Sequence, residues 1–322
     1  MLRISLCAFL AFLSVDVDAR DRADRLNIGL KAHKITVDSL ERTYRAVVPP
    51  RPTRPMPLVL VLHGGGFGDN SALHVIRYTQ FTKVALRERF IVVYPMAVDG
   101  NWNDGRDVDF IRAQKEDIDD VKFIRAVVDD VAKDHPVDRT RIFSTGISNG
   151  AFMSNRLAAE ASDLVAGVAP VVGGMGPSLA KSFTPRYAVS VFIIQGDADP
   201  LVPIDGGAVG MRLGKKRGLT IKSSEVVAKY LKHNGITGQP AVAMLEDTNS
   251  DDGTTTEMRI YPDGESGSKV QAYIVKNGGH TWPGKRQYLT EKLVGKTSQD
   301  FDATEAIWEF FKSCPPRRLK SQ

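Results

Sequence analysis

The sequence predicts an α/β fold in which helices cover both faces of a mostly parallel central sheet. Short apolar runs typical of buried strands alternate with helical stretches along nearly the whole chain. Two of these runs, LVLVL at 58–62 and FIVVY at 90–94, are apolar throughout, as expected for strands buried on both faces. The composition, with 42% hydrophobic and 25% charged residues, is ordinary for a globular protein.

The predicted strands follow from two kinds of pattern. Continuous apolar runs indicate strands inside the sheet, and alternating apolar and polar residues over 34–48 indicate two antiparallel strands at a sheet edge. In chain order, we expect strands at 34–48, 58–62, 90–94, 141–145, 165–172, 189–195, 240–246, 255–261 and 271–275.

The predicted helices are supported by caps and apolar faces. Asp69-Asn70-Ser71 can cap the first helix, and apolar residues share one face of the second. Asp302 and Glu305 make a capping-box-like start for the last helix, which Pro315-Pro316 ends. In chain order, we expect helices at 72–87, 117–133, 151–159, 222–234 and 302–313.

The N-terminal residues have the pattern of a signal peptide. Arg3 precedes an apolar run at 4–15, and small or modest residues lead to a possible cleavage site after Ala19. We therefore expect residues 1–19 to be removed from a secreted or periplasmic protein, and residues 20–322 to form a single domain. The apolar run is too short to span a bilayer, so we expect no membrane anchor.

Residues 141–150, RIFSTGISNG, contain a G-x-S-x-G pattern between an expected strand and an expected helix. A side chain at Gly146 or Gly150 would collide with the neighbouring strand or helix. The turn exposes the Ser148 hydroxyl at the amino end of a helix, where free N–H groups favour developing negative charge. Because the pattern arises by chance in roughly one such chain in ten, its function depends on a matching base, acid and oxyanion hole.

A serine hydroxyl needs a base within hydrogen-bond reach to act as a nucleophile. After Ser148 the chain offers His233 and His280. His233 lies in an amphipathic helical stretch and is interpreted as a surface residue. His280 directly follows a strand, in the loop GGHTWPG, and catalytic groups gather at the carboxyl ends of strands in open α/β sheets. We therefore expect His280 to be the base.

The acid is expected between the serine and the histidine in the chain, again after a strand. The strand at 189–195 leads to Asp197 and Asp199 in the turn GDADP, and the composition of this turn also suits an ordinary turn without function. Asp199 is preferred over Asp197, and Asp205 is a third candidate.

An oxyanion hole needs two N–H donors beside the nucleophile. The amide of Asn149 is one candidate, and Gly65 in the loop HGGG after strand 58–62 is the other. The alternative is a flexible glycine turn. A phosphate-binding loop is disfavoured because G-x-G-x-x-G does not match and Gly295-Lys296-Thr297 lacks the earlier glycine of a Walker loop. His63 is expected to support the loop by hydrogen bonding rather than to act as a base.

These residues resemble the secreted polyhydroxybutyrate depolymerases and the feruloyl or acetylxylan esterases of the α/β-hydrolase superfamily. The resemblance covers most of the mature chain and rests on LVLVLHGGG, YPMA with NW, RIFSTGISNGAFMS, QGDADPLVPIDGG, NGGHTWPG and DATEAIWEFF. It implies the α/β-hydrolase fold, a triad of Ser148, Asp199 and His280, and an acyl-binding cleft flanked by Trp102 and Trp282. The alternative for these two tryptophans is hydrophobic packing beneath loops.

We therefore expect a secreted serine carboxylesterase that acts on hydroxyalkanoate oligomers or plant-wall esters. No cofactor or metal is expected, because the six histidines are scattered without an H-x-x-x-H or Cys–His cluster. The net charge of +5 is spread without a basic run, so no nucleic-acid partner is expected. Relatives often have a disulfide or a polymer-binding domain; the mature chain has one cysteine and shows no such domain, which favours soluble oligomers and small esters. The alternatives are a serine peptidase on the same fold and a non-catalytic carbohydrate-binding protein.

Overall fold

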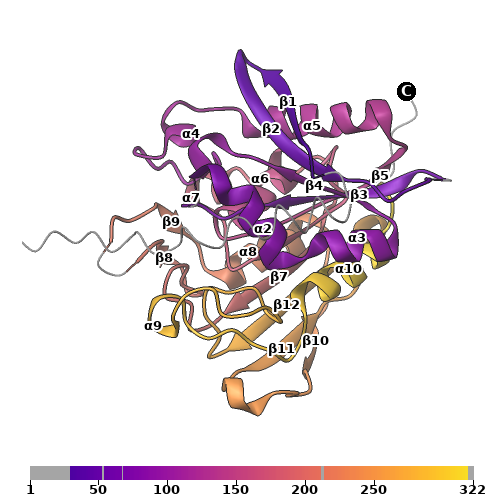
Figure 1. Cartoon of the computed structure of the whole chain (residues 1–322). Coiled ribbons are helices and arrows are strands. Elements are labelled where there is room, and N and C mark those ends of the chain that lie inside the picture. The colour runs from indigo at the N-terminus through magenta and orange to yellow at the C-terminus, as the bar shows by residue number, and fades with distance from the viewer. Residues whose placement is uncertain (1–29, 53, 67, 212–213, 318–322) are drawn as a thin grey trace, which may run out of the picture.

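The structure, a computed structural model, describes residues 30–52, 54–66, 68–211 and 214–317. The predicted signal peptide at 1–19 lies outside these ranges. A ten-stranded sheet runs through the described residues (Figure 1). Its strands, in spatial order, are β1 (Ala32–Val37), β2 (Leu40–Val47), β4 (Ile91–Pro95), β3 (Met56–Leu62), β5 (Val137–Ile147), β6 (Gly167–Val171), β7 (Ser190–Gly196), β12 (Val270–Lys276), β11 (Thr255–Ile260) and β10 (Ala241–Met244).

The direction of the strands confirms the mostly parallel sheet. Neighbouring strands from β4 to β12 pair in parallel, whereas β1 and β2 at one edge and β11 and β10 at the other pair antiparallel. Because the central strands are parallel, the segments that follow β3, β5, β7 and β12 all leave the sheet at the same end, where the carboxyl ends of these strands lie. The residues expected to carry the chemistry lie at this end.

Helices cover both faces of the sheet. Leu58, Leu60 and Leu62 of β3 belong to a core with α5 (Asp120–Asp134), α6 (Asn149–Glu160) and α8 (Ser223–His233). The alternate residues Val59 and Val61 belong to a second core with α2 (Ser71–Thr79), α3 (Phe81–Glu88) and α10 (Ala303–Ser313). This alternation explains why the central strands are apolar throughout, since both of their faces are buried.

The expected helix at 72–87 is wrong in one respect, because the structure has two helices there. Gln80 separates α2 from α3 with a left-handed φ of 61°. The carbonyl of Thr79, at the end of α2, accepts a hydrogen bond from the Thr304 hydroxyl of α10 at 2.6 Å. Gln80 is itself a good helix former, so the break is set by tertiary contacts and leaves no signal in the local sequence.

Several short elements were not predicted. They are α4 (Arg112–Lys115), α7 (Pro177–Lys181), α9 (Glu291–Val294), the hairpin strands β8 (Gly207–Ala208) and β9 (Leu219–Thr220), and 3₁₀ turns at Gly68–Asn70, Val98–Gly100, Ser250–Asp252 and Glu265–Gly267. Each is too short for hydrophobic periodicity to register. No helix within the described ranges is both long enough and apolar enough to cross a membrane.

The packing of α10 on the sheet yields a stability prediction. The ring of Phe311 is fully buried and stacks on Phe143 of β5, with 4.6 Å between the ring centroids. Phe311→Ala should lower the free energy of unfolding by about 3–5 kcal/mol, because a large buried side chain is removed and a cavity remains. Urea denaturation measures the change. Leu293→Ala is the control, since Leu293 is 44% exposed and its loss should change stability by at most about 0.5 kcal/mol. Equal effects of the two substitutions would contradict this account.

Candidate active site

Ser148 occupies a strained turn between β5 and α6. Its φ of 55° and ψ of −119° are unusual for a residue with a side chain. The turn is tightly enclosed: a Cβ on Gly150 would lie 2.3 Å from the carbonyl oxygen of Leu62, and a Cβ on Gly146 would lie 2.6 Å from the same oxygen. The predicted need for both glycines is therefore confirmed, and the half-buried Ser148 stands at the first turn of α6.

The acid and the base expected from the sequence are hydrogen bonded to each other. His280 Nδ1 lies 2.8 Å from Asp199 Oδ2, and both side chains are buried. The other carboxylate oxygen, Oδ1, accepts hydrogen bonds from the amides of Leu201 at 2.7 Å and Val202 at 2.9 Å. Since the carboxylate accepts, His280 carries its proton on Nδ1, and Nε2 is left with a lone pair that can receive a proton. Among the described residues, the Ser148 hydroxyl makes no hydrogen bond to this ring, a contact that is often long in an enzyme without substrate.

The other acidic candidates have different surroundings. Asp197 Oδ1 accepts a hydrogen bond from the Asn277 amide at 2.7 Å, and its carboxylate lies 3.8 Å from the ammonium of Lys276. Asp205 is exposed. Asp199 is thus the aspartate that the structure brings to His280. The other histidine after the serine, His233, ends α8 and is half-buried, with its Nε2 3.1 Å from the Tyr187 carbonyl.

His63 supports the HGGG loop, as the sequence predicted. Its Nε2 accepts a hydrogen bond from the Ala97 amide at 3.1 Å, so its Nδ1 carries the proton and donates to the Gly64 carbonyl at 2.8 Å. Burial lowers the pKa of His63 to about 4. The ring is therefore neutral near pH 7 and acts as a fixed link between this loop and the segment after β4.

Two unused amides lie beside the serine. A Cβ on Gly65 would lie 3.5 Å from the Cβ of Asn149 and only 2.5 Å from Asn101 Oδ1, so a side chain at this position would displace the Asn101 amide. A Cβ on the preceding Gly64 would lie 3.6 Å from the Cβ of Ser148. Within the described part of the chain, neither the Gly65 nor the Asn149 amide donates a hydrogen bond. Two free N–H groups therefore lie where an oxyanion hole is expected.

Trp102 and Trp282 are both fully buried. The indole N–H of Trp102 donates to the His63 carbonyl at 3.0 Å, and that of Trp282 donates to the Thr304 hydroxyl at 3.0 Å. Neither ring reaches the surface in this structure, so the contacts agree with packing beneath loops and not with exposed walls of a cleft. Trp102 is thereby linked to the HGGG loop, and Trp282, in the loop of His280, is linked to α10.

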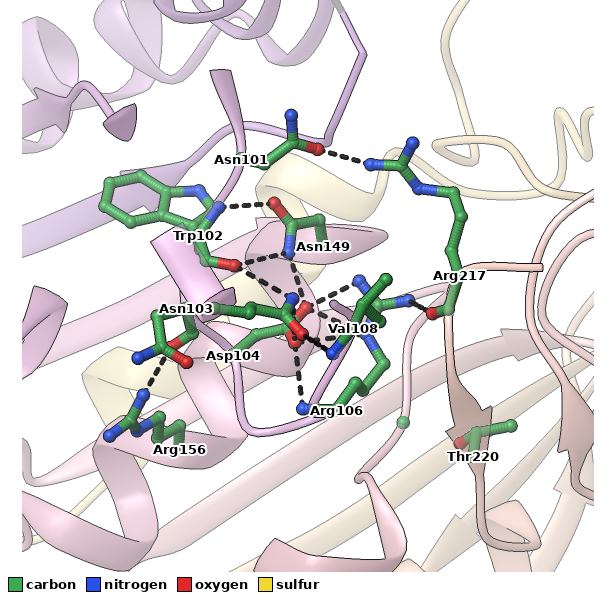
Figure 2. Close-up of polar contacts among 12 residues, drawn as sticks. Asn101, Trp102, Asn103, Asp104, Arg106, Val108, Asn149, Arg156, Arg217 and Thr220 are labelled. Atoms are coloured by element: carbon green, nitrogen blue, oxygen red, sulfur yellow. Dashed lines mark hydrogen bonds and ion pairs between the residues drawn. The ribbon is translucent and has the colours of Figure 1, made fainter. Parts of the chain in front are cut away.

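A buried ion pair that the sequence analysis missed holds the Asn149 side chain (Figure 2). Asp104 accepts a hydrogen bond from Asn149 Nδ2 and forms an ion pair of 2.6 Å with Arg106, and both charged side chains are at most 2% exposed. The other end of the amide, Asn149 Oδ1, accepts from the Trp102 amide at 2.8 Å. The residue after the serine is therefore fixed at both ends of its side chain. No local sequence pattern links Asp104 to Asn149, which lies 45 positions further along the chain.

The ion pair yields a second stability prediction. Asp104→Asn leaves the buried Arg106 guanidinium without its counter-charge and should lower the free energy of unfolding by about 3–5 kcal/mol. Urea denaturation of Asp104→Asn, Arg106→Met and the double variant would measure the coupling between the two side chains. The double variant should lose clearly less than the sum of the single losses, because it leaves no unpaired charge. If the loss of unfolding free energy in the double variant equals the sum of the two single losses, the ion pair is contradicted.

The environment of His63 yields a prediction for the pH dependence of stability. Its pKa falls from 6.5 to about 4 on folding, so the unfolded chain binds the proton first as the pH drops. The stability linked to this group is complete above about pH 6.5 and is lost as the pH approaches 4, by about 3 kcal/mol in total. In His63→Gln this contribution is absent. The difference in the free energy of unfolding between wild type and variant, measured by urea denaturation, should therefore shrink by about that amount from pH 7 to pH 4. Parallel curves would show that His63 does not titrate in this way.

Comparison with known proteins agrees with this geometry. No family model matches the chain. The protein "Putative esterase NocK" of Nocardia uniformis subsp. tsuyamanensis is 31% identical over 296 residues, which cover 87% of this chain and 81% of that protein. Poly(3-hydroxyalkanoate) depolymerase C of Paucimonas lemoignei is 32% identical over 40% of this chain, and the match spans 31% of the depolymerase. Feruloyl esterase B of Piromyces equi is 27% identical over 69% of this chain and 42% of its own length.

A solved structure shows the same fold. The acetyl xylan esterase from Aspergillus awamori aligns with 88% of this chain and 100% of its own, with a TM-score of 0.60 at 14% identity. The likeness in sequence to the relative from Nocardia covers 87% of this chain. The chain therefore belongs to the family of carboxylic-ester hydrolases with the α/β-hydrolase fold that includes the esterase from Nocardia, polyhydroxyalkanoate depolymerases and feruloyl esterases.

Proposed function

We propose that the chain is a secreted serine carboxylesterase whose catalytic triad is Ser148, His280 and Asp199. The observation that carries this proposal is the buried hydrogen bond of 2.8 Å between His280 Nδ1 and Asp199 Oδ2. This hydrogen bond lies at the carboxyl ends of the parallel strands, where the turn of Ser148 also lies. It leaves His280 Nε2 as the basic atom.

In the first half of the reaction, His280 Nε2 takes the proton of Ser148 as its oxygen attacks the ester carbonyl. Asp199 holds the imidazole in the required tautomer and stabilises its cation. The negative charge that develops on the carbonyl oxygen is received by the Asn149 and Gly65 amides, which have no other acceptor among the described residues.

In the second half, the alcohol leaves with the proton from His280, and the acyl group stays on Ser148. Water then gives a proton to His280 as its oxygen attacks the acyl-enzyme, and His280 passes this proton to the Ser148 oxygen as the acid leaves. These steps use only side chains and backbone amides of the chain, and they call on no cofactor or metal.

The substrate is an ester of the classes named for the relatives, either a hydroxyalkanoate oligomer or a plant-wall ester such as a feruloyl or acetylxylan ester. Residues 1–19 act as the signal peptide of a secreted or periplasmic enzyme, and residues 20–322 form one catalytic domain.

The test is a hydrolysis panel on the mature protein with methyl ferulate, acetylated xylan, short p-nitrophenyl esters and 3-hydroxybutyrate oligomers. Ser148→Ala should lower kcat by roughly 10⁴- to 10⁶-fold without unfolding the chain, because the nucleophile is lost. Asp199→Asn should lower kcat by about 10⁴-fold, because the tautomer of His280 is no longer fixed. The matched control, Asp197→Asn, should remain within a few-fold of wild type.

Four outcomes would overturn parts of the proposal. Equal rates of wild type and Ser148→Ala would exclude the serine as nucleophile. A larger loss in Asp197→Asn than in Asp199→Asn would reassign the acid. Hydrolysis of a peptide anilide without hydrolysis of matched esters would indicate a peptidase. Failure of Ser148 to react with a fluorophosphonate would favour a non-catalytic binding protein.

A further inference from the structure

The β8–β9 hairpin connects the loops around the proposed site. The Gly210 amide donates to the carbonyl of Leu201 at 2.8 Å, and Leu201 in turn donates to the Asp199 carboxylate. Val209 packs with Val202 of the acid loop and Phe152 of α6 in a small apolar cluster. The hairpin is therefore attached to the acid loop and to the helix that starts at the nucleophile.

Arg217 extends from this hairpin to Asn101 (Figure 2). Its backbone amide pairs with the Val209 carbonyl at 2.8 Å, and its Nη2 donates to Asn101 Oδ1. A Cβ on Gly65 would lie 3.0 Å from this nitrogen, so the half-buried guanidinium is next to Gly65 itself. An ester held by the Gly65 amide would have Arg217 as its immediate neighbour.

Positive charge is in excess around Arg217. Two guanidiniums, those of Arg106 and Arg217, lie near a single carboxylate, that of Asp104. Arg106 binds this carboxylate through Nε at 2.9 Å and Nη2 at 2.6 Å. Among the described residues Arg217 forms no ion pair, and its hydrogen bond to Asn101 leaves the other N–H groups of the guanidinium available. Burial, together with the charge of Arg106, lowers the pKa of Arg217, and Asp104 opposes this shift. An arginine remains charged at neutral pH, so this region favours an anion.

We propose that Arg217 binds a carboxylate of the substrate, so that the enzyme prefers esters with a free carboxylate near the scissile bond to neutral esters. This inference rests on the proposed function and deepens it. A short hydroxy-acid oligomer has this chemistry, because its terminal acid lies a few bonds from the last ester. The planar fork of a guanidinium matches the two oxygens of a carboxylate.

A purely structural role for Arg217 gives a different expectation. The bond from Arg217 to Asn101 ties the hairpin to the loop at 99–110, and loss of this tie would disturb the oxyanion loop for every substrate alike. Charge selectivity therefore has to be measured as a ratio between two substrates that differ only in the carboxylate.

The experiment compares kcat/KM for the linear dimer of 3-hydroxybutyrate and for the carboxamide of the same dimer. Wild type should prefer the acid, and Arg217→Gln should lower the ratio of acid to amide by about 10- to 100-fold, as expected for loss of a hydrogen bond between charged groups. Arg217→Lys should retain part of the ratio, because it keeps the charge without the fork. Arg139→Gln is the matched control: Arg139 lies near the amino end of β5, paired with exposed Asp129, and its loss should leave the ratio unchanged.

An unchanged ratio in Arg217→Gln, with both substrates slowed alike, would overturn the inference while leaving the esterase proposal intact. If wild type hydrolyses no ester, the esterase proposal fails, and a second measurement still decides the role of Arg217. Sodium 3-hydroxybutyrate is then titrated calorimetrically into wild type and Arg217→Gln. Binding that weakens at least about tenfold in the variant supports the anion site. Equal binding, or none to wild type, refutes it.

Discussion

The geometry of the candidate site depends on how closely α6 can approach β3. A Cβ on Gly150 would lie 2.3 Å from the carbonyl oxygen of Leu62, so any side chain there would push the helix away from the sheet. Such a shift would carry Ser148 and the Asn149 amide away from Gly65. The strained φ of Ser148 costs roughly 1–3 kcal/mol, which the packing of β5 and α6 has to offset. One tight contact between backbones thus places Ser148 and the Asn149 amide, the proposed nucleophile and oxyanion donor, at the same time.

Buried charge fixes the loop at 99–110 from two sides. On one side, Asp104 and Arg106 hold Asn149. On the other, the Asn103 amide donates to Asp120 Oδ2 at 2.7 Å, and Asp120 forms a buried ion pair with Arg42. Burial raises the pKa of Asp120, and the charge of Arg42 opposes the rise. Buried ion pairs of this kind contribute little net stability compared with apolar packing, but each fully paired oxygen excludes alternative positions of the loop.

The sequence predicted those parts of the molecule whose cause is local. Strands such as β3 are recognisable because both faces are apolar, and Ser148 is recognisable because its turn requires glycine on both sides. His280 and Asp199 could be paired on chain order and on strand ends, and the structure brings them together. The break at Gln80, the burial of both tryptophans and the pair of Asp104 with Arg106 depend on contacts between distant segments, which no local pattern reports.

Leu201 shows how orientation of the acid and recognition of the substrate share one stretch of backbone. Its amide donates to the Asp199 carboxylate, and its carbonyl accepts from Gly210 in the hairpin that carries Arg217. The sheet sets the spacing of Ser148, Asp199 and His280, because each follows a parallel strand. The hairpin is not one of these strands, but it positions the Arg217 guanidinium against Gly65. In the proposed enzyme, rigid strands therefore carry the triad, while a loop anchored to Asp199 carries the residue proposed to distinguish one ester from another.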